Sequence, residues 1–250
     1  MFALTHAYIA CKTLRSNDSR IILGSIVPDY VWNNRKIRNK RNIHYDPFGF
    51  FNYIQKDNRS LTPFAQGIIL HSDISHGVDM YSDSVESGFA FKMGKHLVGD
   101  VMNVFSLDEQ NALDFSHNII EAGTDITIAN RFPAFTRVFS KTKEKISLLK
   151  IANVLSSFSN TPLNKTEKAI DDLKIFYFRE DLLSDESIIY KCLIPIVESR
   201  FHKTTEKTYL SLSILLKKAK KIILGTYDSF ISNTITLIQT DPLLIPYLKR

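Results

Sequence analysis

Apolar residues recur at the three- and four-residue spacing of an α-helix along most of this chain, and this pattern limits its fold more than any other feature. Only 9 glycines and 8 prolines interrupt the 250 residues, and no hairpin pattern is evident. The sequence therefore predicts an all-α fold, a single multi-helix, bundle-like domain with a long loop over 30–60. We expect helices near 4–14, 20–26, 62–77, 84–104, 108–129, 136–158, 164–181, 184–203 and 205–240.

Composition excludes several classes of protein. A hydrophobic content of 44% and a charged content of 23% are ordinary for a globular chain and exclude wholesale disorder. Two cysteines cannot form a disulfide framework. No run of eighteen apolar residues occurs, and the first residues lack the basic region of a signal peptide. A cytoplasmic protein is the expectation.

The net charge of +6 comes largely from two basic runs, 35–41 and 217–221. These runs are either solvated helix and loop surfaces or a surface that attracts phosphate-bearing partners, such as a peripheral contact with an anionic membrane. Aromatic residues do not interleave with them, so there is no specific nucleic-acid motif.

Six of the seven histidines lie at or before residue 117. Histidine and aspartate accompany apolar helices in the first part of the chain, whereas lysine, isoleucine, leucine and serine dominate later. We therefore expect residues 1–130 to carry a metal site between helices and residues 131–250 to pack against it and cover it.

The strongest local motif is HNIIE, which places His117 and Glu121 four residues apart on one helix face. An imidazole and a carboxylate on one face can ligate the same metal ion. Asp125 continues the stripe one turn further, as a candidate substitute ligand or a residue supporting the ligands. The alternative is a hydrogen-bonded helix face partly in water.

A second cluster follows an apolar helix in FAQGIILHSDISHGVD. His71 follows three large aliphatic residues, and Asp73, His76 and Asp79 come within eight residues of it. His71 and His76 differ by about 140° around a straight helix, so one helix cannot aim both at one point. Either the helix ends at Gly77 and bends His76 inward, or the two histidines serve different metals.

Three further residues would each be assigned to structure if taken alone. His6 lies on an apolar helix, Asp29 follows Pro28 after an apolar run, and His44 lies in an aromatic loop.

In order along the chain, these motifs resemble the zinc-dependent phospholipase C family, whose superfamily also includes zinc-dependent single-strand nucleases. A weaker similarity, through GIILHSDISHGVDMYSD, is to acyl-carrier-protein phosphodiesterases, which also have a helical fold. The resemblance covers residues 4–125. The residues that carry it are His6 in THAYIA, Asp29 in PDY, His44 in HYDP, His71 in GIILH, and His117 with Glu121 in HNIIE.

The resemblance implies an all-α phosphodiester hydrolase with two or three zinc ions and a metal-bound hydroxide as nucleophile. It implies that Asp29, His44 and His71 hold one zinc ion, with Asp29 also the candidate catalytic base. His117 and Glu121 would hold a second ion, with His76 a candidate third ligand. His6 would help to hold a further ion. The substrate would be a phosphate-containing small molecule or a lipid.

The sequence departs from the family pattern at one position. The family has a bridging Asp four residues after the equivalent of His71, and this chain has Ser75 there. Asp73 and Asp79 are close in sequence, but neither has the right helical phase unless the helix is irregular. Three hypotheses follow: a zinc-dependent hydrolase, a degenerate binding module on the same scaffold, and a basic helical interaction protein.

Overall fold

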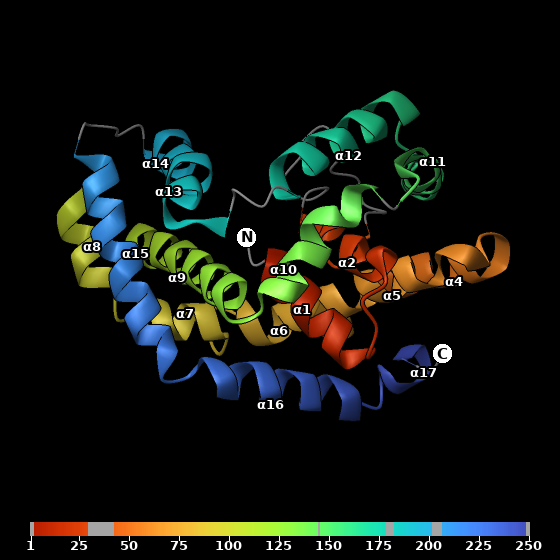
Figure 1. Cartoon of the computed structure of the whole chain (residues 1–250), viewed down its shortest axis with the longest axis horizontal. Helices are drawn as coiled ribbons and strands as arrows, with labels where there is room; N and C mark the ends of the chain where they lie inside the picture. The colour runs from red at the N-terminus through yellow and green to blue at the C-terminus, as the bar shows by residue number, and fades with distance from the viewer. Residues whose placement is uncertain (1–2, 30–42, 145, 179–182, 202–206, 249–250) are drawn as a thin grey trace.

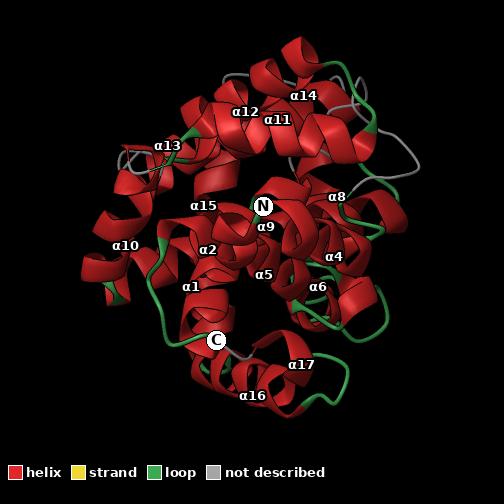
Figure 2. Cartoon of the chain, turned by 90° about the vertical axis from the view of Figure 1, so that its right-hand side faces the viewer, coloured by secondary structure: helices red, strands yellow, loops and turns green. Residues whose placement is uncertain are grey.

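The structure, a computed structural model, describes the chain apart from residues 1–2, 30–42, 145, 179–182, 202–206 and 249–250. Every regular element in the described part is a helix (Figures 1 and 2). The predicted all-α fold is confirmed. None of the described helices combines the length and the apolar character needed to cross a membrane.

Close packing near the N-terminus depends on two glycines. Helices α2 (Ser19–Gly24) and α5 (Thr62–His71) cross where Gly24 and Gly67 face each other. A Cβ atom on Gly24 would collide with the carbonyl of Phe64, and one on Gly67 would collide with the carbonyl of Ile21. Because glycine has no side chain, the two backbones can touch. This contact brings the turn after α2 against the end of α5, where His71 lies.

The longest helix, α9 (Glu109–Arg131), joins two hydrophobic clusters. One cluster surrounds α1 (Ala3–Thr13), α2 and α5, and α9 contributes Ile128 to it. The other contains Phe115 and Ile119 of α9 with residues of α7 (Phe89–Gly94), α8 (Val98–Phe105) and α15 (Thr208–Leu224). Helix α16 (Tyr227–Thr240) packs along α1, as Figure 1 shows at the lower edge. Late helices thus pack on early ones, consistent with one domain.

The expectation of a long loop over 30–60 is wrong for its second half. Helix α4 (Pro47–Asp57) forms there because Asp46 accepts a hydrogen bond from the backbone N–H of Gly49 and Pro47 occupies the first turn. Phe50 and Ile54 bury one face of this helix. Residues 30–42 lie outside the described part.

The remaining helices are α6 (Val78–Ser82), α10 (Pro133–Ser140), α11 (Leu148–Ser159), α12 (Leu163–Tyr177), α13 (Asp185–Ile188), a π-helical turn (Ile189–Leu193), α14 (Ile194–Phe201) and α17 (Ile245–Leu248).

Of the two basic runs, 35–41 lies outside the described residues and 217–221 lies on α15. Within the second run, Lys218 pairs with Asp100 and Lys220 pairs with Asp185. Two of the lysines therefore have acidic partners within the protein. Contact of this surface with a membrane stays a prediction.

Candidate metal centre

The centre of the site is His71, the last residue of α5, whose side chain is fully buried. Its Nδ1 lies 2.8 Å from the carbonyl oxygen of Ser25, in the turn that follows α2. A carbonyl can only accept, so Nδ1–H is the donor and Nε2 is left with its lone pair when the ring is neutral. A backbone carbonyl that fixes one nitrogen in this way is the usual support of a metal-binding histidine.

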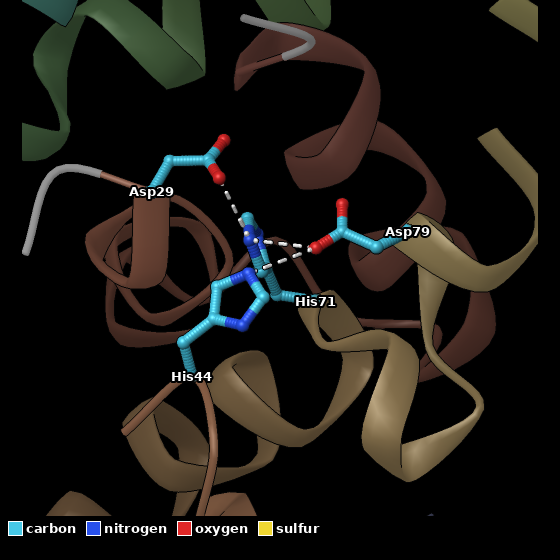
Figure 3. Close-up of side chains that lie close together, drawn as sticks. All are labelled: Asp29, His44, His71 and Asp79. Atoms are coloured by element: carbon cyan, nitrogen blue, oxygen red, sulfur yellow. Dashed lines mark ion pairs between the residues drawn. The ribbon is translucent and has the colours of Figure 1, made fainter. Parts of the chain in front are cut away.

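Two carboxylates face this nitrogen. The Nε2 atom of His71 lies 3.2 Å from an oxygen of Asp29 and 3.2 Å from an oxygen of Asp79, and it makes no hydrogen bond of good geometry (Figure 3). Ligands at about 2.0–2.1 Å from a tetrahedral zinc ion are separated by about 3.3 Å. The distances around His71 therefore match the edges of a coordination tetrahedron, and the buried unsatisfied nitrogen is what an ion would satisfy.

His44 completes this first cluster. Its Nε2 lies 3.3 Å from the Asp79 oxygen that also faces His71, and Figure 3 shows the two rings converging on that carboxylate. One ligand atom from each of the four residues lies within 4.8 Å of the others. The first cluster is Asp29, His44, His71 and Asp79, two imidazoles and two carboxylates.

His6 contacts the same centre from α1. Its Nε2 lies 2.7 Å from the other oxygen of Asp79, and its ring stacks on that of His71 with centroids 4.5 Å apart. One carboxylate of Asp79 therefore faces His44 and His71 with one oxygen and His6 with the other. A carboxylate in this position can bridge two ions.

The irregular end of α5 explains why Asp79 occupies this position. The helix ends at His71 rather than at Gly77, a short 3-10 turn follows, and α6 begins at Val78. Ser75 is buried in the turn, where its hydroxyl lies 2.5 Å from the carbonyl of Ile69 and donates to backbone oxygen. Ser75 thus lies outside both clusters, and the nearby carboxylate that faces His71 comes from the next helix.

The pKa values reflect these close charges. Burial alone would lower the pKa of His71, but Asp79 and Asp29 outweigh it, so the pKa is raised above its ordinary value. Burial alone would raise the pKa of Asp79, but the charge of His71 together with hydrogen bonds from His44, His6 and His71 outweighs it, and this pKa is lowered. Positive charge is therefore favoured between these two carboxylates, and a divalent cation bound there would supply it.

A second cluster lies on α9 and at the end of α6. The Nε2 atom of His117 lies 3.3 Å from Glu121 and 3.2 Å from Asp83, again tetrahedral edge lengths. The His117 ring stacks on Phe91 at 4.3 Å between centroids, which fixes its plane. Burial opposes protonation of His117, but Glu121 and Asp83 outweigh it and raise its pKa to about 10. The second cluster is Asp83, His117 and Glu121.

Asp83 is a candidate ligand that the sequence reasoning missed. Burial, followed by the charge of Glu121, raises its pKa, as expected for two carboxylates that share one site. A signal was present in VDMYSD, because Asp79 and Asp83 are four residues apart and follow the helical period. The segment is thus able to give one carboxylate to each cluster.

The structure places three predicted site residues elsewhere. Asp125 accepts hydrogen bonds from the backbone N–H groups of Leu4 and Thr5, so it holds the start of α1, and it belongs to neither cluster. His76 contacts Asp241 near the C-terminus and belongs to neither cluster. Asp73 is exposed and belongs to neither cluster. Asp125 thus anchors the helix that carries His6, as a residue supporting the ligands would, and its alternative role as a substitute ligand stays a prediction.

Both clusters open onto one cavity of about 570 Å³. Its walls include Asp29, His44 and Asp79 of the first cluster and Asp83 of the second. Four carboxylates line it, because Asp73 is on the wall as well. An anion would be repelled by such a surface unless cations occupied it. The cavity is therefore built either for cations alone or for an anion that binds through them.

Comparison with known proteins finds no matching family model, no matching curated sequence and no matching solved structure. The fold and the clusters define an all-α protein with two candidate metal centres, formed by His/Asp and by His/Asp/Glu side chains. The metal they would hold is not identified by these donors alone, because imidazole and carboxylate suit zinc, iron and manganese.

Proposed function

We propose that this chain is a zinc-dependent phosphodiester hydrolase with a phospholipase C-like site. The observation that carries the proposal is Asp79, whose single carboxylate faces His6, His44 and His71 above a cavity shared with the second cluster. A bound zinc ion would lower the pKa of water toward neutrality and offset the charge of a phosphoryl group. Two such centres on one cavity suit hydrolysis of a phosphodiester.

The residues of the chain contribute orientation and charge. The His71–Ser25 hydrogen bond and the stacking of His117 on Phe91 fix two imidazole ligands before an ion arrives. Asp29 lines the cavity, and its side chain keeps 23% of its exposure. Burial opposes ionisation of Asp29, but His71 outweighs it and lowers its pKa. An ionised carboxylate that reaches the cavity suits Asp29 for holding the attacking water by a hydrogen bond.

Apolar side chains beside the acidic cavity favour a lipid substrate. Ile74 and Met80 line the cavity and are exposed, and Tyr45, next to His44, is exposed as well. A phosphodiester that carries an apolar chain could place its phosphate over the clusters and its chain on these residues. Among phosphate-containing small molecules and lipids, we therefore propose a phospholipid.

Metal analysis with a hydrolysis assay tests this proposal. The purified chain should contain about two or three zinc ions and cleave bis(p-nitrophenyl) phosphate and a short-chain phosphatidylcholine. A chelator should abolish both activities, and added zinc should restore them. His117→Ala should lose zinc from the second cluster and lower both rates by at least about 100-fold, whereas the exposed His96→Ala should change neither.

Two outcomes would contradict the proposal. A chain with substoichiometric metal after gentle purification, or a His117→Ala variant with full activity, would refute the metal-dependent mechanism. Stoichiometric zinc without turnover of either substrate would instead support the alternative of a non-catalytic binding module on the same scaffold.

A further inference from the structure

The wall of the same cavity carries a histidine outside both clusters, His76, which pairs with an aspartate from late in the chain. The Nδ1 atom of His76 lies 2.8 Å from an oxygen of Asp241, a residue 165 positions later that follows α16. Since a carboxylate accepts, Nδ1–H is the donor. His76 lines the cavity with Asp29, Asp79 and Asp83, and its side chain is 43% exposed. In the described part of the chain, no protein atom forms a hydrogen bond with its Nε2.

The backbone of His76 is left-handed, with φ 58° and ψ 33°. Glycine adopts this conformation at the least cost, and asparagine tolerates it. Two backbone hydrogen bonds maintain it, from His76 N to Asp73 O at 2.9 Å and from Gly77 N to Ser72 O at 2.8 Å. These two hydrogen bonds fix the backbone from which the His76 imidazole projects.

Asp241 is fixed independently of His76. One of its carboxylate oxygens accepts a hydrogen bond from the backbone N–H of Leu243 at 2.8 Å, and the other faces His76. Its own backbone carbonyl accepts from Leu244 and Ile245. The carboxylate is therefore held in place, 14% exposed, and orients the His76 ring through its Nδ1.

We propose that His76 is the general acid of the hydrolysis and that Asp241 is its positioning residue. This inference rests on the proposed function. The oxygen of the attacking water bonds to phosphorus, and a proton of that water passes to solvent in the open cavity. The bond from phosphorus to the leaving oxygen breaks, and that oxygen takes the proton of His76 Nε2. Solvent in the open cavity then returns a proton to His76 Nε2.

The test compares two leaving groups in the zinc-loaded, full-length protein. A nitrophenolate leaves without a proton, whereas an alkoxide, as from short-chain phosphatidylcholine, needs one. His76→Asn keeps a residue that tolerates the left-handed backbone and removes the acid. It should lower phosphatidylcholine hydrolysis by about 100-fold or more and bis(p-nitrophenyl) phosphate hydrolysis by less than about fivefold, with zinc content unchanged. His96→Asn, an exposed histidine, is the matched control.

Asp241→Asn supplies a readout that does not depend on turnover. An amide in this position can present N–H to Nδ1, so the neutral ring should carry its proton on Nε2 instead of Nδ1. The ring nitrogen shifts of His76, followed by NMR in the wild-type and Asp241→Asn proteins, report that change. The variant should also lose phosphatidylcholine hydrolysis more than bis(p-nitrophenyl) phosphate hydrolysis.

Each other outcome overturns the assignment in its own way. Equal losses on the two substrates with full zinc content would mean that His76 acts before the leaving group departs. Loss of zinc in His76→Asn would make it a ligand, and unchanged rates would leave the pair with a structural role. If the wild-type protein cleaves neither substrate, the proposed function fails and the general acid fails with it, although the tautomer measurement would still describe the pair.

Discussion

Replacing Asp79 by asparagine tests the first cluster most directly. The substitution keeps the size of the side chain and removes the charge that faces His6 at 2.7 Å, His71 at 3.2 Å and His44 at 3.3 Å. The side chain of Asp79 is 8% exposed, so solvent can do little to stabilise the three imidazoles that lose their charged partner. We expect Asp79→Asn to weaken zinc binding more than any other single carboxylate substitution in the cavity.

The magnitude follows from the contacts. Substituting a residue that only supports a ligand lowers metal affinity by about 10- to 100-fold, so loss of a ligand carboxylate should cost at least about 100-fold. With zinc at about 100 times the wild-type Kd, binding adds about 2.7 kcal/mol to the free energy of unfolding. At the same zinc concentration, a variant bound 100-fold more weakly gains only about 0.4 kcal/mol.

Denaturant unfolding with and without zinc measures this difference. Each protein serves as its own reference, because the metal-free value already contains the cost of losing the buried charge, which is about 3–5 kcal/mol. Asp172→Asn is the control, since that carboxylate pairs with the exposed Lys168 far from the cavity residues in sequence. If Asp79→Asn retained the full zinc-dependent gain and the full metal count, the bridging role of Asp79 would be refuted.

Two further predictions concern Ser75 and Asp125, which lie outside both clusters. Ser75→Asp should not raise activity and should destabilise the fold by several kcal/mol, measured by denaturant unfolding, because it places a carboxylate against the buried carbonyls of Ile69 and Ser72. Burial, partly offset by hydrogen bonds from Thr5, raises the pKa of Asp125 to about 6, so the folded state keeps a proton that the unfolded state loses near pH 4. The free energy of unfolding of the wild type relative to Asp125→Asn should therefore fall by up to about 3 kcal/mol between pH 4 and pH 7, and a difference that is flat or rises with pH would contradict this.

Most of the helical pattern could be predicted from the sequence, because periodic apolar residues bury one face of each helix. The helix carrying His117 and Glu121 is the clearest example, since its expected range of 108–129 agrees closely with α9, Glu109–Arg131. Where the helix bounds differ from the prediction, local capping and turns set them. Asp46 starts α4 in an expected loop, and the turn after His71 ends α5 six residues before Gly77.

Local sequence spacing predicts some of the candidate ligands, whereas others depend on the tertiary structure. His71, His117 and Glu121 could be found from local spacing, because their positions on a helix follow from the sequence. The pairing of Asp79 with His6 could not, because it depends on a turn whose geometry is set by Ser75 and the left-handed His76. If the helical rotation of 100° per residue is continued across that turn, Asp79 is placed on the wrong face.

By itself, the sequence determined that this chain is helical and that its early histidines and carboxylates mark a site. Only the tertiary structure decided which carboxylate meets which histidine. Asp83 meets His117 across 34 residues, and Asp241 meets His76 across 165. The physical reason is that helix periodicity acts over a few residues, whereas these contacts require helices distant in sequence to pack at a fixed angle and depth.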